Sequence, residues 1–138
     1  MAAESLYQKI ILDGSRDTAY VGALPSGEQA TVSNPLCGDE ITLYAELNGS
    51  TLDKLSYACT GCAICKASAS VLAKTLTGKS TDAAKALSTA FQASLTGHTD
   101  SDLSAQLEAF QELKNYPTRK RCGTLPWEAL DLLLKVEK

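Results

Sequence analysis

The pattern of hydrophobic and polar residues predicts a small β-sheet in the first half of the chain. In residues 41–47 (ITLYAEL) apolar side chains occupy every second position, which is the period of a half-buried strand. Asn48 and Gly49 follow, and this dipeptide is typical of a two-residue hairpin turn, so residues 52–60 (LDKLSYACT) should pair back. With a further strand at residues 28–34 (EQATVSN), the pattern indicates a three-stranded antiparallel sheet.

The period changes to that of α-helices in the other parts of the chain. Apolar residues recur every three to four positions in five segments, which Gly, Pro or polar residues separate. These predicted helices are residues 4–12, 63–77, 80–95, 103–113 and 127–138. The sequence therefore predicts an α+β fold with an N-terminal helix, a small three-stranded antiparallel sheet and then several packed helices.

Two of these helices carry more specific expectations. In residues 63–77 the apolar side chains lie on one side, whereas Lys66 and Ser70 share the opposite side, which is expected to face solvent. In the last helix Pro126 has no N–H to donate, and proline is best tolerated in the first turn of a helix. The last helix should therefore begin near residues 124–126.

Composition and charge narrow the class of protein. The chain has 138 residues, the length of one domain, and it lacks the run of about 18 apolar residues that a transmembrane helix needs, so no membrane partner is expected. Its N-terminus lacks the basic and apolar regions of a signal peptide, so we expect a cytoplasmic protein. The formal net charge of −3 argues against nucleic acid as a partner, because phosphate binding relies on clustered Lys and Arg.

Five cysteines are the main candidates for chemistry, and three of them stand at every third position. An iron–sulfur ladder built on Cys59, Cys62 and Cys65 would need a fourth cysteine at position 69, which is alanine. A thioredoxin-like CxxC formed by Cys62 and Cys65 would need βαβ units, which the pattern lacks. A third interpretation singles out Cys62, between a strand and a helix. Cys65 is then expected in the core, and Cys59 is either a packed thiol or a residue near the site.

Other chemistry-bearing residues also stand at the ends of predicted elements. Cys37 and Asp39 flank Gly38 in the turn between the first two strands, and Cys122 stands at the start of the last helix. If these ends meet at Cys62, three thiolates and one carboxylate form a four-coordinate site of a kind that zinc accepts. Spacing alone leaves this hypothesis open, because the chain has no paired CxxC motifs.

Three segments resemble the IscU/SufU family of iron–sulfur cluster assembly proteins, whose members are NifU N-terminal-like. The segments are NPLCGDEITLYAEL from Asn34, GCAICKASASVL from Gly61 and RKRCGTLPWEALDLLLK from Arg119. Together they are specific, and the resemblance extends over about residues 6–135. It implies a SufE/NifU-like fold and one domain over residues 1–138.

Carried over residue by residue, the resemblance implies a ligand set. Cys37, Cys62 and Cys122 match the three functional cysteines of the family, and Asp39 matches its aspartate. The positions of the two remaining cysteines are not ligands in the family. In the SufU branch this set implies a bound zinc ion. In IscU-like scaffolds the same residues would hold iron or a transient [2Fe–2S] cluster.

The branch depends on two features. IscU-type proteins carry histidine immediately before the last cysteine, where this chain has Arg121, and the only histidine, His98, is expected in a solvated loop. A helical insertion at about residues 96–116 also resembles the SufU branch. The N-terminal segment of this chain departs from the family's pattern. Residues 13–20 (DGSRDTAY) lack the His, Tyr and Pro pattern that the family usually has there.

The resemblance to SufU implies a function in sulfur transfer. A cysteine desulfurase, SufS-like, would deliver persulfide sulfur, and Cys37 on the turn beside Gly38 is the predicted acceptor. A histidine of the desulfurase would replace one cysteine at the zinc ion. The protein would act as an accessory to the desulfurase rather than a stand-alone enzyme, and it would pass sulfur to downstream Fe–S assembly proteins. The alternative is an IscU-like scaffold that assembles and transfers a [2Fe–2S] cluster.

Overall fold

The sheet predicted from the first half of the chain is present in the computed structural model. The structure describes residues 16, 19–24, 27–34, 38–61, 63–95 and 117–134. Its strands are β1 (Glu28–Asn34), β2 (Asp39–Asn48) and β3 (Thr51–Thr60). They form an antiparallel sheet in the order β1-β2-β3, which confirms the three predicted strands.

The alternation in β2 places its apolar side chains in the core. Ile41, Leu43 and Ala45 are fully buried, while the residues between them are half-buried. The alternation weakens at Leu47, which is only partly buried, because the pairing of β2 with β3 shifts register between Glu46 and Leu47. The sequence period therefore predicts the buried face wherever the pairing is regular.

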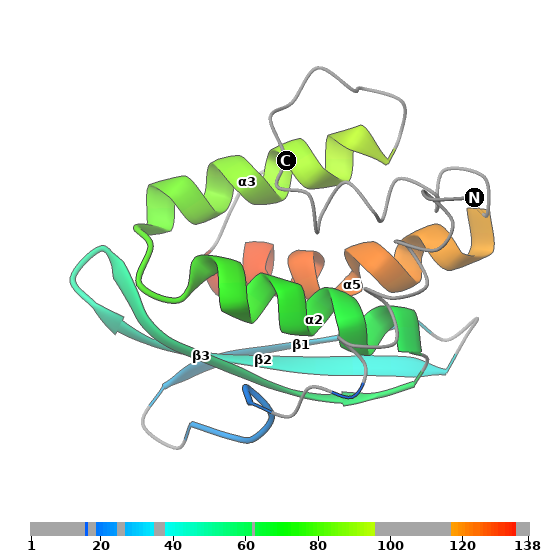
Figure 1. The fold of residues 1–138 in the computed structure, drawn as a ribbon, viewed down its shortest axis with the longest axis horizontal. Helices are drawn as coiled ribbons and strands as arrows, with labels where there is room; N and C mark the ends of the chain where they lie inside the picture. The colour runs from blue at the N-terminus through cyan, green and yellow to red at the C-terminus, as the bar shows by residue number, and fades with distance from the viewer. Residues whose placement is uncertain are drawn as a thin grey trace.

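Three described helices lie over one face of the sheet (Figure 1). They are α2 (Ala63–Leu76), α3 (Thr81–Ser94) and α5 (Pro117–Leu134). Helix α2 packs against β3, α5 packs against β1 and β2, and α3 packs against α5. The predicted α+β architecture is confirmed, with the core between the sheet and the helices.

Helix α2 is covered on more than one side, which corrects one prediction. Ser70 was expected on the solvent side with Lys66, but it is only 1% exposed, whereas Lys66 is half-buried. The helical period does not contain this burial, because it depends on tertiary contacts of α2, which include those with β3 and α5.

Helix α3 begins where the sequence predicts. Ser80 is its N-cap, and the Oγ of Ser80 accepts a hydrogen bond of 3.1 Å from the backbone N–H of Ala83. Further along the helix, Phe91 is fully buried and its ring packs on Trp127 of α5, with ring centroids 5.2 Å apart. This aromatic contact helps to hold α3 against α5.

Helix α5 begins earlier than the sequence predicts. Its first residue is Pro117, a position where a missing N–H costs nothing, and the helix continues through Cys122. Pro126 therefore lies inside the helix, and the prediction that the helix begins near residues 124–126 was wrong. Pro126 cannot donate to the carbonyl of Cys122, but both of its chain neighbours are fully buried, so tertiary packing outweighs the lost hydrogen bond.

A short segment before β1 extends the sheet beside β3. Tyr57 of β3 donates its backbone N–H to the carbonyl of Tyr20 and accepts from the N–H of Gly22, each at 2.9 Å. Val21 is thereby bridged to Tyr57 in parallel orientation. The hydrophobic pattern predicts no strand here, because a single bridge has no periodic signal.

Some predictions concern residues outside the described part. These are the helices at residues 4–12 and 103–113, the insertion at about 96–116, and the side chains of Cys37, Cys62 and His98. One domain over residues 1–138 likewise stays a prediction. Within the described ranges, no helix combines the length and the apolar character needed to cross a membrane.

Candidate metal centre

Asp39, the first residue of β2, lies against the junction between β3 and α2. It is 2% exposed. Gly61 adopts a φ of +139°, and a Cβ added there would stand 2.7 Å from the Cγ and 2.9 Å from the Cα of Asp39, and closer still to its Oδ1. Both the backbone conformation and the lack of space require glycine at this position. Asp39 is therefore packed against the residue that directly precedes Cys62.

Cys122 lies near the start of α5 and is buried. The buried hydroxyl of Ser68 on α2 holds this part of α5 in place. It donates a hydrogen bond of 2.5 Å to the carbonyl of Gly123 and accepts one of 3.1 Å from Nε1 of Trp127. These two hydrogen bonds fix the helix turn that carries Cys122 against α2.

The neighbours of Cys37 and Cys62 are described, although these two cysteines are not. Gly38, which follows Cys37, is exposed and adopts a φ of +72° in the left-handed region. Its N–H donates a hydrogen bond of 2.9 Å to the carbonyl of Asn34, which closes the turn between β1 and β2. The turn thus returns the chain directly into the strand that begins with Asp39.

The element ends that carry the predicted ligands lie at the same end of the molecule. Figure 1 shows the end of β1, the start of β2, the end of β3, the start of α2 and the first turns of α5 together at the right-hand end. Asp39 and Cys122 are both buried residues of this end. The described residues alone contain no cluster of three or more Cys, His, Asp or Glu side chains that could hold a metal ion, and Cys37 and Cys62 are outside them.

The chemistry of the donor set fits a zinc ion. Zinc binds thiolate sulfur and carboxylate oxygen, most often with four ligands. Asp39 would supply the oxygen, and Cys37, Cys62 and Cys122 would supply the sulfurs. Asp39 is buried, and hydrogen bonds or a cation must offset the charge of a carboxylate placed in this way.

Two cysteines outside this set face each other. The Sγ of Cys59 on β3 lies 3.2 Å from the Sγ of Cys65 on α2. Cys65 is fully buried, as the sequence predicts, whereas Cys59 is half-buried. The pKa of Cys59 is lowered, chiefly because the ionised thiol accepts a hydrogen bond from Cys65. The positive charge of Lys66 also lowers this pKa, whereas burial and the negative charge of Asp39 raise it by less.

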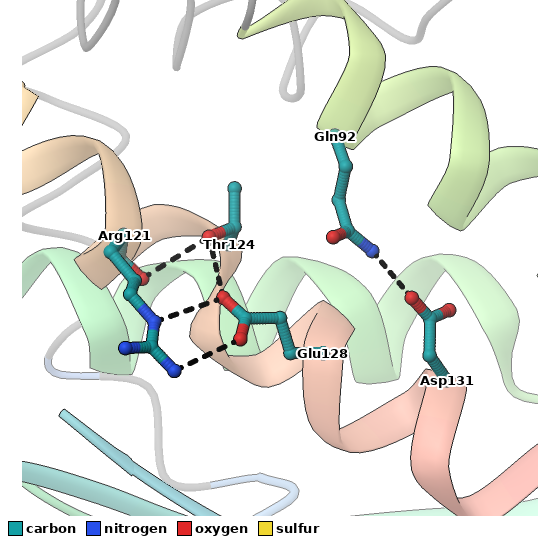
Figure 2. Close-up of polar contacts among 5 residues, drawn as sticks. All are labelled: Gln92, Arg121, Thr124, Glu128 and Asp131. Carbon is teal, nitrogen blue, oxygen red and sulfur yellow. Dashed lines mark hydrogen bonds and ion pairs between the residues drawn. The ribbon is translucent and has the colours of Figure 1, made fainter. Parts of the chain in front are cut away.

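Arg121 is an exposed residue with an acidic partner on its own helix. Its Nη2 lies 3.2 Å from Oε1 of Glu128, and its Nε donates to Oε2 of the same carboxylate at 3.4 Å (Figure 2). Thr124 donates a further hydrogen bond of 3.0 Å to this carboxylate. The side chain of Arg121 is 46% exposed, so it can reach a partner protein, while its ion pair contributes little to stability.

Sequence reasoning missed a buried polar network between α3 and α5. Asp131 accepts hydrogen bonds of 2.7 Å from Oγ of Ser88 and 2.8 Å from Nε2 of Gln92. Figure 2 shows the Gln92 side chain reaching down from α3 to Asp131. The available signal was one aspartate at the start of an apolar run, DLLL, which a helical pattern alone assigns to the solvent side.

Comparison with known protein families decides which family this arrangement represents. The NifU-like N terminal domain family matches residues 6–123, which is most of the chain. The chain belongs to this family. The resemblance inferred from the three cysteine-containing segments is therefore confirmed, and relatives in this family include both SufU and IscU proteins.

Similar proteins come from both branches of the family. The zinc-dependent sulfurtransferase SufU of Bacillus subtilis (strain 168) is 32% identical over 130 residues, which cover 93% of this chain and 88% of that protein. The iron–sulfur cluster assembly scaffold protein IscU of Streptococcus pyogenes serotype M1 is 30% identical over 132 residues, which cover 94% and 83%. Sequence identity alone does not separate the two branches.

Solved structures share the fold. FiSufU of Fervidobacterium islandicum AW-1, described as an iron–sulfur cluster assembly scaffold protein for the SUF system, has a TM-score of 0.88 and 28% identity, covering 95% of this chain and 98% of that chain. The N-terminal part of a NifU-like protein from Brucella abortus has a TM-score of 0.87 at 24% identity, covering 96% and 94%. The second likeness concerns the fold alone.

Proposed function

We propose that this protein is a zinc-dependent acceptor of persulfide sulfur in iron–sulfur cluster assembly, of the SufU type. Its donor is a cysteine desulfurase, SufS-like, its downstream recipients are other Fe–S assembly proteins, and it works in the cytoplasm as an accessory protein. The observation that carries the proposal is the buried carboxylate of Asp39. It packs against Gly61, which has no side chain and directly precedes Cys62 in the chain. The similar SufU of Bacillus subtilis, named a zinc-dependent sulfurtransferase, supports the proposal.

In this proposal Cys37, Asp39, Cys62 and Cys122 hold the zinc ion, which when bound keeps the cysteine thiols ionised. Contacts in the described part of the chain support two of them, Asp39 and Cys122. Gly61 leaves room for the carboxylate of Asp39, and the turn that begins after Asn34 returns the chain to it. The buried hydrogen bonds between α2 and α5 fix the helix turn that carries Cys122.

Cys37 is the proposed sulfur acceptor. Its thiolate attacks the outer sulfur of the desulfurase persulfide, the S–S bond of the donor breaks, and the donor cysteine leaves as a thiolate. The transferred sulfur remains on Cys37 as a new persulfide, so the step needs no oxidant or reductant. Gly38 is exposed directly beside Cys37. Arg121 lies next to Cys122 in the chain, and its guanidinium would exchange its partner Glu128 for an anionic persulfide.

The test compares two single-cysteine replacements. Cys37→Ala is expected to abolish both activation of the desulfurase and persulfide on this protein, because the accepting sulfur is gone. Cys59→Ser is the matched control, since it removes a thiol outside the proposed ligand set, and it should retain both. Full activation with unaltered persulfide in the Cys37→Ala protein would overturn the acceptor assignment.

A second candidate function is that of an IscU-like scaffold, on which a [2Fe–2S] cluster forms on the same four residues and is then transferred. The observation in its favour is the similarity to the Streptococcus pyogenes protein named as such a scaffold. Against it stands Arg121, which occupies the position before the last cysteine where the IscU branch carries histidine. Iron and sulfide bound to the purified protein would favour this second function.

A further inference from the structure

Cys59 and Cys65 are thiols that the proposed sulfur transfer does not use, yet their sulfur atoms are in contact. The Sγ–Sγ distance is 3.2 Å. A disulfide bond is about 2.05 Å long, so the two sulfurs need to approach by only about 1.2 Å to form one. This contact is therefore a candidate for thiol chemistry.

Regular secondary structure holds both sulfurs in place. Cys59 lies on β3, where it pairs with Ile41 of β2, and Cys65 lies in the first turn of α2. Cys65 is fully buried and Cys59 is half-buried, so reagents in solution reach the pair through Cys59. One accessible thiol backed by one buried thiol is the arrangement of a reactive cysteine with a resolving cysteine.

We propose that Cys59 and Cys65 form a redox-modification site, a dithiol that a hydroperoxide converts reversibly into an intramolecular disulfide. The Cys59 thiolate attacks one peroxide oxygen, the O–O bond breaks, and the sulfur becomes a sulfenic acid while water or an alcohol leaves. The thiol of Cys65 then attacks the sulfenic sulfur, the S–S bond forms and water leaves. The peroxide takes up the two electrons that the two thiols lose, and a dithiol reductant restores the pair by exchange.

The position of the pair gives the modification a local consequence. The disulfide would tie the end of β3 to the first turn of α2 and so close the short segment that contains Gly61 and Cys62. Asp39 packs against Gly61, so the modified pair borders the candidate metal centre without consuming any of its four proposed ligands. The pairing itself does not depend on sulfur transfer and can be tested separately.

The experiment uses the Cys62→Ser variant, because the tryptic peptide Leu55–Lys66 otherwise contains three cysteines. The folded protein is treated with hydrogen peroxide, remaining thiols are alkylated, and the peptide is analysed by mass spectrometry. We expect a peptide that is lighter by two hydrogen atoms and carries no alkyl group, and that returns to the dithiol with dithiothreitol. Fragmentation of the same peptide from the wild-type protein should place its disulfide between Cys59 and Cys65.

Two controls make the result decisive. In guanidinium chloride the disulfide should form at least about tenfold more slowly, because the fold no longer holds the two sulfurs together. Replacement of Cys65 by serine should let peroxide carry Cys59 on to sulfinic acid, since no resolving thiol is present. Three outcomes would each overturn the proposal. The first is over-oxidation of Cys59 while Cys65 can still be alkylated, and the second is a wild-type disulfide that includes Cys62. The third is an equal rate of disulfide formation in the folded and unfolded protein.

Discussion

Gly61→Ala is the substitution that tests most sharply how the fold positions Asp39. The added methyl group would lie 2.9 Å from the Cα of Asp39 and nearer to its carboxyl group, and backbone cannot move aside as a flexible side chain would. The φ of +139° at Gly61 adds conformational strain. We expect about 1–3 kcal/mol from the backbone strain and a similar cost from the steric clash, so the free energy of unfolding should fall by about 2–6 kcal/mol.

Gly22→Ala is the matched control for this substitution. Gly22 has a φ of +136°, nearly that of Gly61, but a Cβ there would meet no atom within 4 Å. It should therefore cost only the strain of about 1–3 kcal/mol. The difference between the two variants measures the contact with Asp39, independently of glycine's backbone freedom.

Urea unfolding followed by tryptophan fluorescence supplies the free energies, because Trp127 is fully buried and is the chain's one tryptophan. Gly61→Ala should also lower the free energy of unfolding by less in an Asp39→Ala background than in the wild type. The reason is that Asp39→Ala removes the two side-chain atoms that the methyl group would meet. Equal destabilisation by Gly61→Ala and Gly22→Ala, with no coupling to Asp39→Ala, would refute the packing of Asp39 on Gly61.

Three further predictions follow from described contacts. Ser68→Ala removes a buried hydroxyl that links α2 to α5 and leaves Nε1 of Trp127 without its acceptor, so urea unfolding should show a loss of about 2–3 kcal/mol; a loss below about 0.5 kcal/mol would contradict this. Arg121→Ala breaks an exposed ion pair and should change stability by less than about 0.5 kcal/mol in the same assay, whereas a larger loss would mean the pair is structural. Cys65 lowers the pKa of Cys59, so alkylation of Cys59 should persist to lower pH in the wild type than in Cys65→Ala. Identical pH profiles of alkylation would exclude the hydrogen bond from Cys65 as the cause of the lowered pKa.

The parts of the fold that were predictable from the sequence are those with a local signal. The alternation around Ile41 and Leu43 fixed the buried face of β2, and Ser80 marked the start of α3 through its capping hydroxyl. Such features depend on neighbours in the chain, so periodicity and capping chemistry contain them. The same holds for Cys65, whose place on the apolar face of its helix predicted its burial.

The features that were not predictable depend on contacts between distant segments. Pro126 is tolerated inside α5 because buried neighbours hold that turn, and Ser70 is buried although the helical period groups it with Lys66. The close approach of Asp39 to Gly61 likewise joins two segments far apart in the chain. Local propensity is a weak guide wherever tertiary packing acts in this way.

At the candidate site, the sequence nominates four residues for the chemistry, and that assignment stays a prediction, while the contacts around two of them come from the fold. Asp39 and Cys122 are buried at the end of the molecule where the predicted elements meet. The assignment of Cys37 and Cys62 to the same site stays a prediction. The contact between Cys59 and Cys65 was invisible in the spacing, because it depends on how the strand turns into the helix.

The measurement that tests the central claim most directly is metal and sulfide analysis of the protein purified without oxygen. The proposal predicts about one zinc ion per chain, little iron and no acid-labile sulfide, with zinc lost in Asp39→Ala and Cys122→Ser but retained in Cys59→Ser. Stoichiometric iron and sulfide without zinc would contradict the zinc-dependent acceptor and support the cluster scaffold instead.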